Sequence, residues 1–244
     1  MPWRTAHHSG NRPAAAPGRT RCPRHLPPPT PMSHQPRPSP PNLLGNRTDH
    51  GTEPAGRTTM RYIEVEQKYQ VKDITALKAA LEKRGAEPGL TTRQVDTYYN
   101  APHRDFLAPD TISEWLRLRE SEHGDSINYK RWLPADAVVK THCDEFETPV
   151  EDIEALRRTL QALDFTIVIA VEKVREEWTV PGLVEVAFDT VTGAGDFVEF
   201  EFKGQATEPA EAIAQLDAFI ADLDVELGDR VNRGYPHILL GRER

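Results

Sequence analysis

Charged side chains of like sign recur at every second residue in several parts of this sequence. The acidic pairs are Glu64 and Glu66, Glu145 and Glu147, and Glu199 and Glu201; the basic pairs are Arg117 and Arg119, and Lys173 and Arg175. On a β-strand, such pairs lie on one face with Cα atoms about 6.5 Å apart, so two carboxylates can reach one hard cation. Mg²⁺ or Mn²⁺ prefers oxygen ligands and is usually shared with phosphate oxygens. Because arginine forks match phosphate geometry, the basic pairs indicate a polyanionic ligand.

The residues around these pairs alternate between apolar and polar, which predicts β-strands with helical interludes. The expected strands are 61–71, 93–100, 112–121, 126–133, 138–148, 166–180, 183–191 and 196–204, and the expected helices are 74–84, 150–163, 208–223 and a short 235–240. Asp73 and Thr207 are predicted helix caps, and Pro149 is expected near the first turn of the second helix. Ile74 and Leu163 are expected on apolar helix stripes. Short strands joined by hairpins imply an antiparallel sheet, and therefore an α+β architecture.

Nearly every predicted strand has one apolar face and one face that carries full charges. Seven bases and nine acids fall on the charged faces: Lys68, Arg117, Arg119, Lys130, Lys173, Arg175 and Lys203, against Glu64, Glu66, Glu145, Glu147, Glu177, Glu185, Asp189, Glu199 and Glu201. One interpretation is an open antiparallel sheet whose charged face is wet. The other is a barrel that encloses the charged face, where the charges need partners, ions or a charged ligand. In a barrel, the excess of acids suits divalent cations.

The order of these motifs is similar to that of a known superfamily. Glu64-Val65-Glu66-Gln67-Lys68 resembles the E-x-E-x-K signature of the CYTH domain, or triphosphate tunnel metalloenzymes, which include class IV adenylate cyclases, thiamine triphosphatases and inorganic triphosphatases. The resemblance continues through Asp96-Thr97-Tyr98-Tyr99, Leu116-Arg117-Leu118-Arg119, Tyr129-Lys130, Glu145-Phe146-Glu147, Lys173-Val174-Arg175, Phe188-Asp189-Thr190-Val191, Glu199-Phe200-Glu201 and Arg233-Gly234-Tyr235. It covers essentially all of 60–244 and implies an eight-stranded antiparallel β-barrel, or tunnel, with helices packed outside. One departure is Gly234, where the family often has Ser.

The resemblance also implies roles for individual residues. The implied metal ligands are Glu64, Glu66, Asp189, Glu199 and Glu201, with Mg²⁺ or Mn²⁺ as the ion. The implied triphosphate-binding residues are Lys68, Arg117, Arg119, Lys130, Lys173, Arg175 and, from the last helix, Arg233. Lys68, Glu66 and Asp189 are expected to take part in the catalytic step. Glu145 and Glu147 face the same cavity, and ion pairing with Arg117 or Arg119 is an equal alternative for them.

The function expected from this resemblance is metal-dependent chemistry on a small-molecule triphosphate: ATP, thiamine triphosphate or tripolyphosphate. Attack by water on the terminal phosphorus would release orthophosphate, whereas attack by a ribose 3′-hydroxyl on the α-phosphorus would give cyclic AMP and pyrophosphate. A fold alone does not choose between these reactions. The alternative function is a non-catalytic module that binds a nucleotide or polyphosphate. Acids on both the first and the last strand favour the enzyme, because binding alone needs mainly bases. A homodimer is plausible for this family.

Composition excludes several other classes of protein. Residues 1–59 hold 13 of the 21 Pro and carry a net charge of +6, which leaves −14 on residues 60–244. The tail is expected to be disordered, because it is too poor in large apolar residues to form a core. An alternative is an artefact of an upstream start codon, since the patterned region opens abruptly at Met60. The acidic remainder argues against a nucleic-acid binder, and no apolar run approaches the roughly 18 residues of a membrane span. With two cysteines, Cys22 and Cys143, the sequence fits a reducing compartment such as the cytoplasm.

Other reactive side chains are expected to be structural. The histidines outside the tail are His103, His123, His142 and His237, and they lack the spacing of metal ligands. Trp115, Trp132 and Trp178 are predicted to fill the core or the rim. Cys143 has no visible partners for a nucleophilic triad, so a half-buried strand thiol is expected.

Overall fold

The computed structural model describes Met60 and residues 62–242, which belong to the unit Glu53–Arg244. The tail at 1–59 that was predicted to be disordered, and Cys22 within it, lie outside the described residues. Within the described part, the strands are β1 (Ile63–Glu64), β2 (Glu66–Gln70), β3 (Glu87–Asn100), β4 (Glu114–Ser121), β5 (Asp125–Leu133), β6 (His142–Val150), β7 (Thr166–Val180), β8 (Val184–Val191) and β9 (Gly195–Phe202). The helices are α1 (Ile74–Lys83), α2 (Ile153–Ala162), α3 (Pro209–Asp222) and α4 (Tyr235–Leu239).

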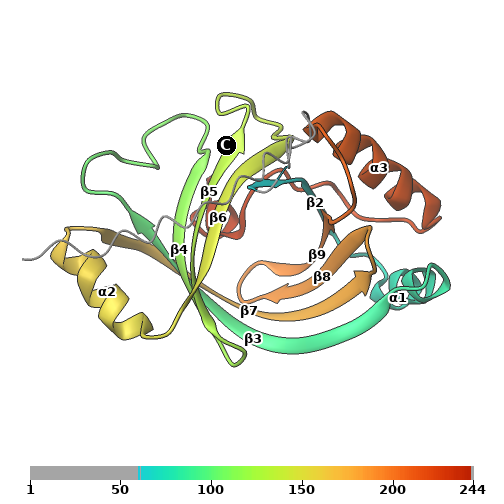
Figure 1. Cartoon of the computed structure of the whole chain (residues 1–244), viewed down its shortest axis with the longest axis horizontal. Helices are drawn as coiled ribbons and strands as arrows, with labels where there is room; N and C mark the ends of the chain where they lie inside the picture. The colour runs from blue at the N-terminus through green and yellow to red at the C-terminus, as the bar shows by residue number, and fades with distance from the viewer. Residues whose placement is uncertain (1–59, 61, 243–244) are drawn as a thin grey trace, which may run out of the picture. The chain divides into compact units, whose positions relative to one another are not determined.

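The sheet curves into a nearly closed barrel because its first strand is shared between its two edges (Figure 1). The strand order is β1-β6-β5-β4-β3-β7-β8-β9-β2, and every pairing is antiparallel. β1 and β2 are the two parts of the predicted strand 61–71, interrupted at Val65. Glu64 therefore lies opposite Cys143 of β6, and Glu66 lies opposite Glu201 of β9. The predicted antiparallel barrel is confirmed, with nine strands in the described residues where eight were expected.

Element boundaries differ from the prediction where proline or a cap decides them. β3 begins at Glu87 instead of residue 93, because its pairing with β7 continues past an irregularity between Pro88 and Thr91. Pro149 lies in β6 and not in a helix, and α2 begins after Asp152, whose side chain accepts from Ala155 N at 2.8 Å. Asp73 caps α1 as predicted. Thr207 does not cap α3, because it donates to Glu211 instead.

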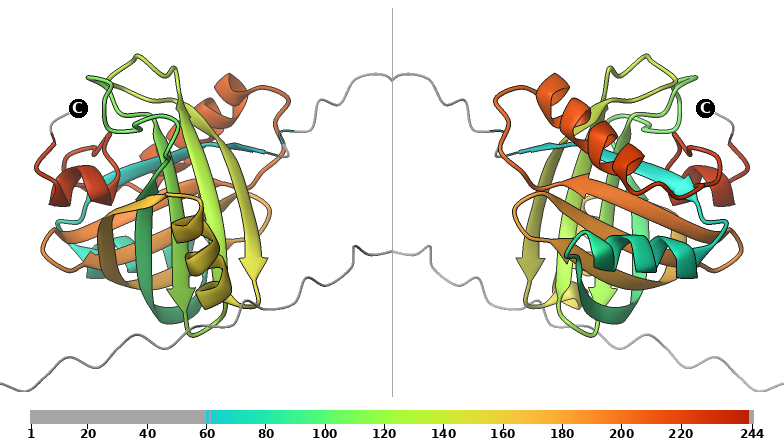
Figure 2. Two further views of the ribbon diagram at one scale, coloured as in Figure 1. Left: turned by 90° about the vertical axis from the view of Figure 1, so that its left-hand side faces the viewer. Right: turned by 90° about the vertical axis from the view of Figure 1, so that its right-hand side faces the viewer.

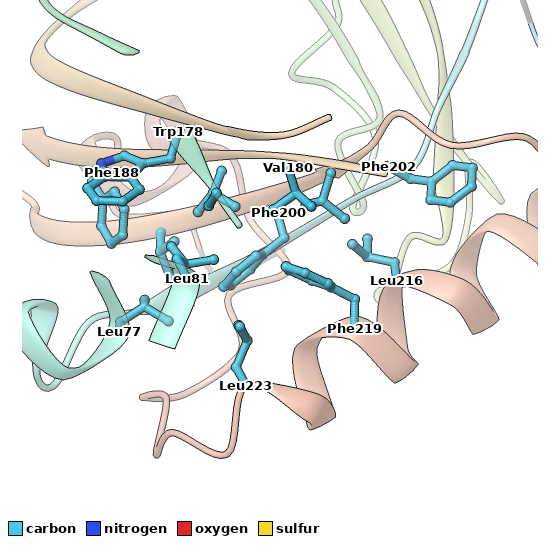
Figure 3. Packing of buried hydrophobic residues seen from close by; sticks show 14 of the residues in the cluster. Leu77, Leu81, Trp178, Val180, Phe188, Phe200, Phe202, Leu216, Phe219 and Leu223 are labelled. Atoms are coloured by element: carbon cyan, nitrogen blue, oxygen red, sulfur yellow. The ribbon is translucent and has the colours of Figure 1, made fainter. Parts of the chain in front are cut away.

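The largest apolar core lies outside the barrel, between the sheet and two helices. Leu77 and Leu81 of α1 and Leu216 of α3 are buried against the outer faces of β8 and β9, where Phe200 lies between them (Figure 3). Figure 2 shows α1 and α3 lying across these strands. The helix stripes are narrower than predicted, since Ile74 is 43% exposed and Leu163 is 57% exposed. The apolar strand faces thus point outward to the helices, which leaves the charged faces inside.

A second apolar cluster packs around α4. Tyr235 of α4 packs with Tyr98 of β3, Trp115 of β4 and Phe197 of β9. The segment that leads into α4 also pairs with β2, because Gly228 N donates to Gln70 O at 2.9 Å. The C-terminal part of the chain therefore forms part of the barrel wall. None of the helices in the described part of the chain is long and apolar enough to cross a membrane.

Candidate active site: a charged tunnel inside the barrel

The charged strand faces enclose a cavity of about 700 Å³ inside the barrel. Apart from Asp189, every residue that the sequence predicts for the site lines this cavity: Glu64, Glu66, Lys68, Arg117, Arg119, Lys130, Lys173, Arg175, Glu199, Glu201 and Arg233. Glu145 and Glu147 line it as well. The interpretation of an open sheet with a wet charged face is therefore wrong. Charges enclosed in this way must be neutralised by one another or by a ligand.

Three carboxylates from three strands meet on one side of the cavity. Glu64 of β1, Glu145 of β6 and Glu201 of β9 each offer an oxygen, and these oxygens lie within 4.8 Å of one another. We call these three residues the acidic cluster. Such a set of carboxylate oxygens fits Mg²⁺ or Mn²⁺, which take hard oxygen ligands. Lys130 of β5 forms an ion pair with Glu64, and its Nζ lies 3.4 Å from an oxygen of Glu66. The same Nζ lies 3.4 Å from an oxygen of Glu145.

Burial and neighbouring charges distribute protons unequally within the acidic cluster. The pKa of Glu64 is raised well above its usual value, because burial penalises its charge more than Lys130 stabilises it. Burial also raises the pKa of Glu145, but the attraction of Lys130 and a hydrogen bond from Asn128 outweigh it and bring this pKa to about 2. Cys143 is fully buried and not half-buried as expected, and its thiol donates to Glu64 at 3.2 Å. Burial raises the pKa of Cys143, so it remains a thiol.

Two arginines of β4, which β5 separates from β6 in the sheet, share one carboxylate. Arg117 and Arg119 of β4 both contact Asp96 of β3, Arg117 at 3.2 Å and Arg119 at 2.7 and 2.9 Å. Asp96 has no exposed surface. Burial raises the pKa of Asp96, but the two guanidinium groups outweigh that effect and hold it well below its usual value. Asp96 therefore fixes both arginine side chains at the cavity wall.

A second buried carboxylate holds the bases of β7. Asp189 of β8 accepts hydrogen bonds from Arg175 at 2.7 and 2.5 Å, from Lys173 at 3.2 Å and from the Tyr235 hydroxyl at 2.7 Å. Burial lowers the pKa of Lys173 to about 7, and the charge of Arg175 adds to this effect. The pKa of Arg175 is raised well above its usual value, because Asp189 and Glu199 outweigh its burial. We call Arg117, Arg119, Lys173 and Arg175 the basic group.

Lys68 connects the strands to the C-terminal segment. Its Nζ lies 2.9 Å from Glu199 Oε1, donates to the Arg233 carbonyl at 3.3 Å and sits 4.1 Å from the centre of the Tyr235 ring. Burial lowers the pKa of Lys68, but the charges of Glu199 and Glu66 outweigh it and raise the pKa overall. Lys68 therefore stays positively charged. The Arg233 side chain donates to the Arg242 carbonyl at 3.1 Å, next to the start of α4.

His237 of α4 lines the cavity and packs against Trp115. Its ring lies edge-on to Trp115, with ring centres 4.8 Å apart, and its Nδ1 accepts from Gly234 N at 3.2 Å. Burial lowers the pKa of His237 to about 4, and the charge of Lys68 adds to this effect. The imidazole is therefore neutral near pH 7. Trp115 and Trp178 are buried, as predicted.

The structure separates residues that the sequence groups together. Of the predicted metal ligands, Glu64 and Glu201 belong to the acidic cluster, and Glu66 lies next to it across Lys130. Glu199 pairs with Lys68 and Arg175, and Asp189 accepts three basic or phenolic donors. The metal-ligand roles of Glu199 and Asp189 stay predictions.

Three buried residues that support the site have no role in the prediction from sequence: Asp96, Asn128 and Tyr235. Asn128 stands two residues before Lys130 on β5, so the strand period could have placed it on the inner face. Asp96 stands two residues before Tyr98 on a predicted strand, which is a similar signal. Tyr235 lies outside the strands, and its contact with Asp189 has no local signal.

Comparisons with known proteins agree with this geometry. Residues 62–235 match the CYTH domain. The PH1012 protein of Pyrococcus horikoshii is 24% identical over 72% of this chain and 98% of its own, with a TM-score of 0.60. The PH1819 protein of the same organism is 25% identical over 74% of this chain and 99% of its own, with a TM-score of 0.59. A Vibrio parahaemolyticus protein described as a candidate adenylate cyclase is 23% identical over 73% of this chain and 98% of its own, with a TM-score of 0.60.

A comparison with curated proteins finds no match. The solved structures share the barrel fold, and the domain match covers most of the described residues, including all strands of the barrel. The residues that line the charged cavity lie within the matched range, apart from Pro236 and His237. This chain therefore belongs to the CYTH family of triphosphate tunnel proteins.

Proposed function

We propose that this protein is a metal-dependent triphosphatase that hydrolyses the terminal phosphoanhydride bond of a triphosphate held inside the barrel. The observation that carries this proposal is the division of one cavity between the acidic cluster and the basic group. In the strand order, the acidic cluster comes from β1, β6 and β9, and the basic group comes from β4 and β7. A phosphate chain between them would meet fixed positive charge on one side and carboxylates suited to a cation on the other.

The basic group would bind the triphosphate without reorganising. Asp96 holds the two arginines of β4, and Asp189 holds Lys173 and Arg175. Donors that are fixed before the reaction stabilise developing charge on phosphate oxygens more effectively than mobile ones. Lys68 stays protonated and would add a further positive charge next to Glu66 and Glu199. Lys173, with a pKa of about 7, could accept or release a proton near neutral pH.

The acidic cluster would hold Mg²⁺ or Mn²⁺ through Glu64, Glu145 and Glu201. When bound, such an ion polarises phosphate oxygens and acidifies a bound water molecule. Asn128 would keep Glu145 in place, since its amide donates to that carboxylate at 2.6 Å. This cluster favours an enzyme over a module that only binds a polyphosphate, because a binding module needs mainly the basic group.

The packing of three of the aromatic side chains that line the cavity favours hydrolysis over cyclisation. Forming a cyclic nucleotide requires the ribose hydroxyl to be held in line with the α-phosphorus, which calls for firm binding of the organic group. Tyr98, Trp115 and Tyr235 line the cavity but are each 6% exposed or less, since they pack against one another and against His237. These three rings therefore offer little free surface on which a base could stack, which leaves the partly exposed Trp132 as the tryptophan in the cavity lining with ring surface to offer. Attack by water on the terminal phosphorus makes no such demand.

The test is to incubate the full chain with tripolyphosphate, ATP or thiamine triphosphate, each with Mg²⁺, with Mn²⁺ and with a chelator. Products are identified by mass spectrometry. We expect metal-dependent release of orthophosphate from at least one substrate. If ATP instead yields cyclic AMP and pyrophosphate, the protein is a cyclase and the proposed hydrolysis is wrong. If no substrate yields a product but tripolyphosphate still binds, the protein is a binding module.

A further inference from the structure

Lys130 occupies an unusual place for a residue expected to bind phosphate. Its ammonium group lies among three carboxylates, those of Glu64, Glu66 and Glu145, and its side chain is 14% exposed. Glu64 and Glu145 are also two of the three residues of the acidic cluster. The ammonium group therefore sits against the same oxygens that would hold a divalent cation.

Electrostatics explains why the ammonium group lies there. Carboxylates packed together in a cavity repel one another and lose hydration, so they need a cation beside them. Two neutral donors also hold these carboxylates, because Cys143 donates to Glu64 and Asn128 donates to Glu145. These donors can stay in place whichever cation is present. An ammonium group and a divalent ion held by the same carboxylates repel each other at this short range, so each weakens the binding of the other.

The strand order gives Lys130 a neighbouring strand on each side. It lies on β5, which stands between β6 of the acidic cluster and β4 of the basic group. Across the β4–β5 pairing it lies opposite Trp115, two residues from Arg117. A lysine side chain has four rotatable methylene bonds and three donors, so it can turn from one neighbouring strand to the other without a change in the backbone.

We propose that Lys130 is an internal substitute for the metal ion, which metal binding displaces from the acidic cluster and frees to contact the triphosphate. Metal binding would thus complete the basic group before the substrate arrives. The second step rests on the proposed function, whereas the displacement itself concerns the metal and this chain alone. The consequence is an ordered assembly of the site, with the metal first.

The first test compares the metal affinity of Lys130→Met with that of the wild type and of Lys140→Met. Lys140 is a matched control because it lines the same cavity, while its Nζ donates to the carbonyls of Pro134 at 3.0 Å and Ala135 at 2.7 Å and not to a carboxylate. Calorimetric titration with Mn²⁺ is done on the full chain without any phosphate, at about pH 8.5 so that fewer carboxyl protons compete. We expect Lys130→Met to bind Mn²⁺ about tenfold tighter or more, because a competing charge is removed. Lys140→Met should stay within about twofold of the wild type, because the Lys140 ammonium group is held by backbone carbonyls and not by carboxylates of the acidic cluster.

A second measurement on the wild type covers the case in which Lys130→Met does not fold. Lysine side chains labelled with ¹³C at Cε are followed by NMR while Mg²⁺ is added. We expect the Lys130 signal to shift in proportion to metal occupancy and the Lys140 signal to stay. A saturable metal site that leaves the Lys130 signal unmoved, or a Lys130→Met protein that binds Mn²⁺ no tighter, overturns the displacement.

The two proposals fail in different experiments. Metal binding that displaces Lys130 without turnover of any triphosphate would end the proposed hydrolysis and leave the displacement intact. Turnover of a triphosphate by a protein in which the metal leaves Lys130 in place would support the hydrolysis and overturn the displacement.

Discussion

Replacing Asp96 by asparagine tests whether the basic group depends on its buried carboxylates. The side chain keeps its shape but loses the charge that faces Arg117 and Arg119 at 2.7 to 3.2 Å. Both guanidinium groups are 14% exposed or less, so water from the cavity replaces the lost carboxylate only in part. Removing one partner of a buried ion pair costs about 3–5 kcal/mol. The remaining amide oxygen still accepts one hydrogen bond, so we expect a loss of about 3 kcal/mol in the free energy of unfolding.

The matched control for this prediction is Asp144→Asn. Asp144 contacts Arg131 with comparable geometry, at 3.2 and 2.6 Å, but Arg131 is 51% exposed. An exposed pair of this kind contributes about 1 kcal/mol or less, because water and salt screen it. Urea denaturation at neutral pH, followed by tryptophan fluorescence, measures both variants. For a domain of this size, the Asp96→Asn protein should melt about 6 °C or more below the wild type.

A ligand adds a second readout to this prediction. Without the Asp96 carboxylate, Arg117 and Arg119 repel each other, so an added polyanion should stabilise the folded variant more than it stabilises the wild type. Tripolyphosphate, in the presence of a chelator, should therefore raise the melting temperature of Asp96→Asn more than that of the wild type. A stability loss no larger than that of Asp144→Asn would refute the reasoning, because it would mean that the arginines are hydrated or paired elsewhere.

Three further predictions follow from the site. Glu201→Gln should lower metal-stimulated hydrolysis by about 100-fold or more while tripolyphosphate still binds, because the substitution removes a carboxylate of the acidic cluster. Assays of phosphate release and of equilibrium binding check this prediction, and unchanged turnover would contradict it. Arg175→Ala should weaken tripolyphosphate binding by about tenfold or more through the loss of charge-assisted bonds, whereas Arg158→Ala, which removes a 77% exposed side chain on α2, should have no effect. His237 is buried with its pKa lowered from 6.5 to about 4, so the unfolded chain binds more protons between these values and stability falls as the pH drops through this window. Urea denaturation at pH values from 4 to 7 should show a smaller decline for His237→Asn, by up to about 3 kcal/mol, and equal declines would contradict the assignment.

The inner face of the barrel could be predicted from sequence because strand periodicity is a local property. Arg117, Lys173 and Glu199 alternate with apolar residues, so their shared face follows from the pleat. The break at Val65 could not be predicted this way. It arises because the backbone at Val65 accepts from Phe202 N at 2.9 Å while its side chain enters the outer core, and this arrangement exists only once the barrel is closed.

The local sequence pattern also could not predict which base pairs with which carboxylate. The sequence places Glu199 and Glu201 together as metal ligands, but Glu199 is held by Lys68 and Arg175 while Glu201 joins Glu64. Which carboxylate meets which base depends on the stagger between strands, and stagger follows from the closure of the whole sheet. The place of Glu145 in the acidic cluster was one of two alternatives for the same reason.

The interrupted first strand has a mechanical consequence. β6 and β9 are not paired with each other, and they are joined only through the short β1 and the following β2. Glu145 lies on β6 and Glu201 lies on β9, with Glu64 of β1 between them. An ion bound by all three carboxylates would cross-link β6, β1 and β9 where β6 and β9 are not paired with each other. Amide exchange along 63–70 should then slow when metal is added, so the same ion would serve both the chemistry and the cohesion of the wall.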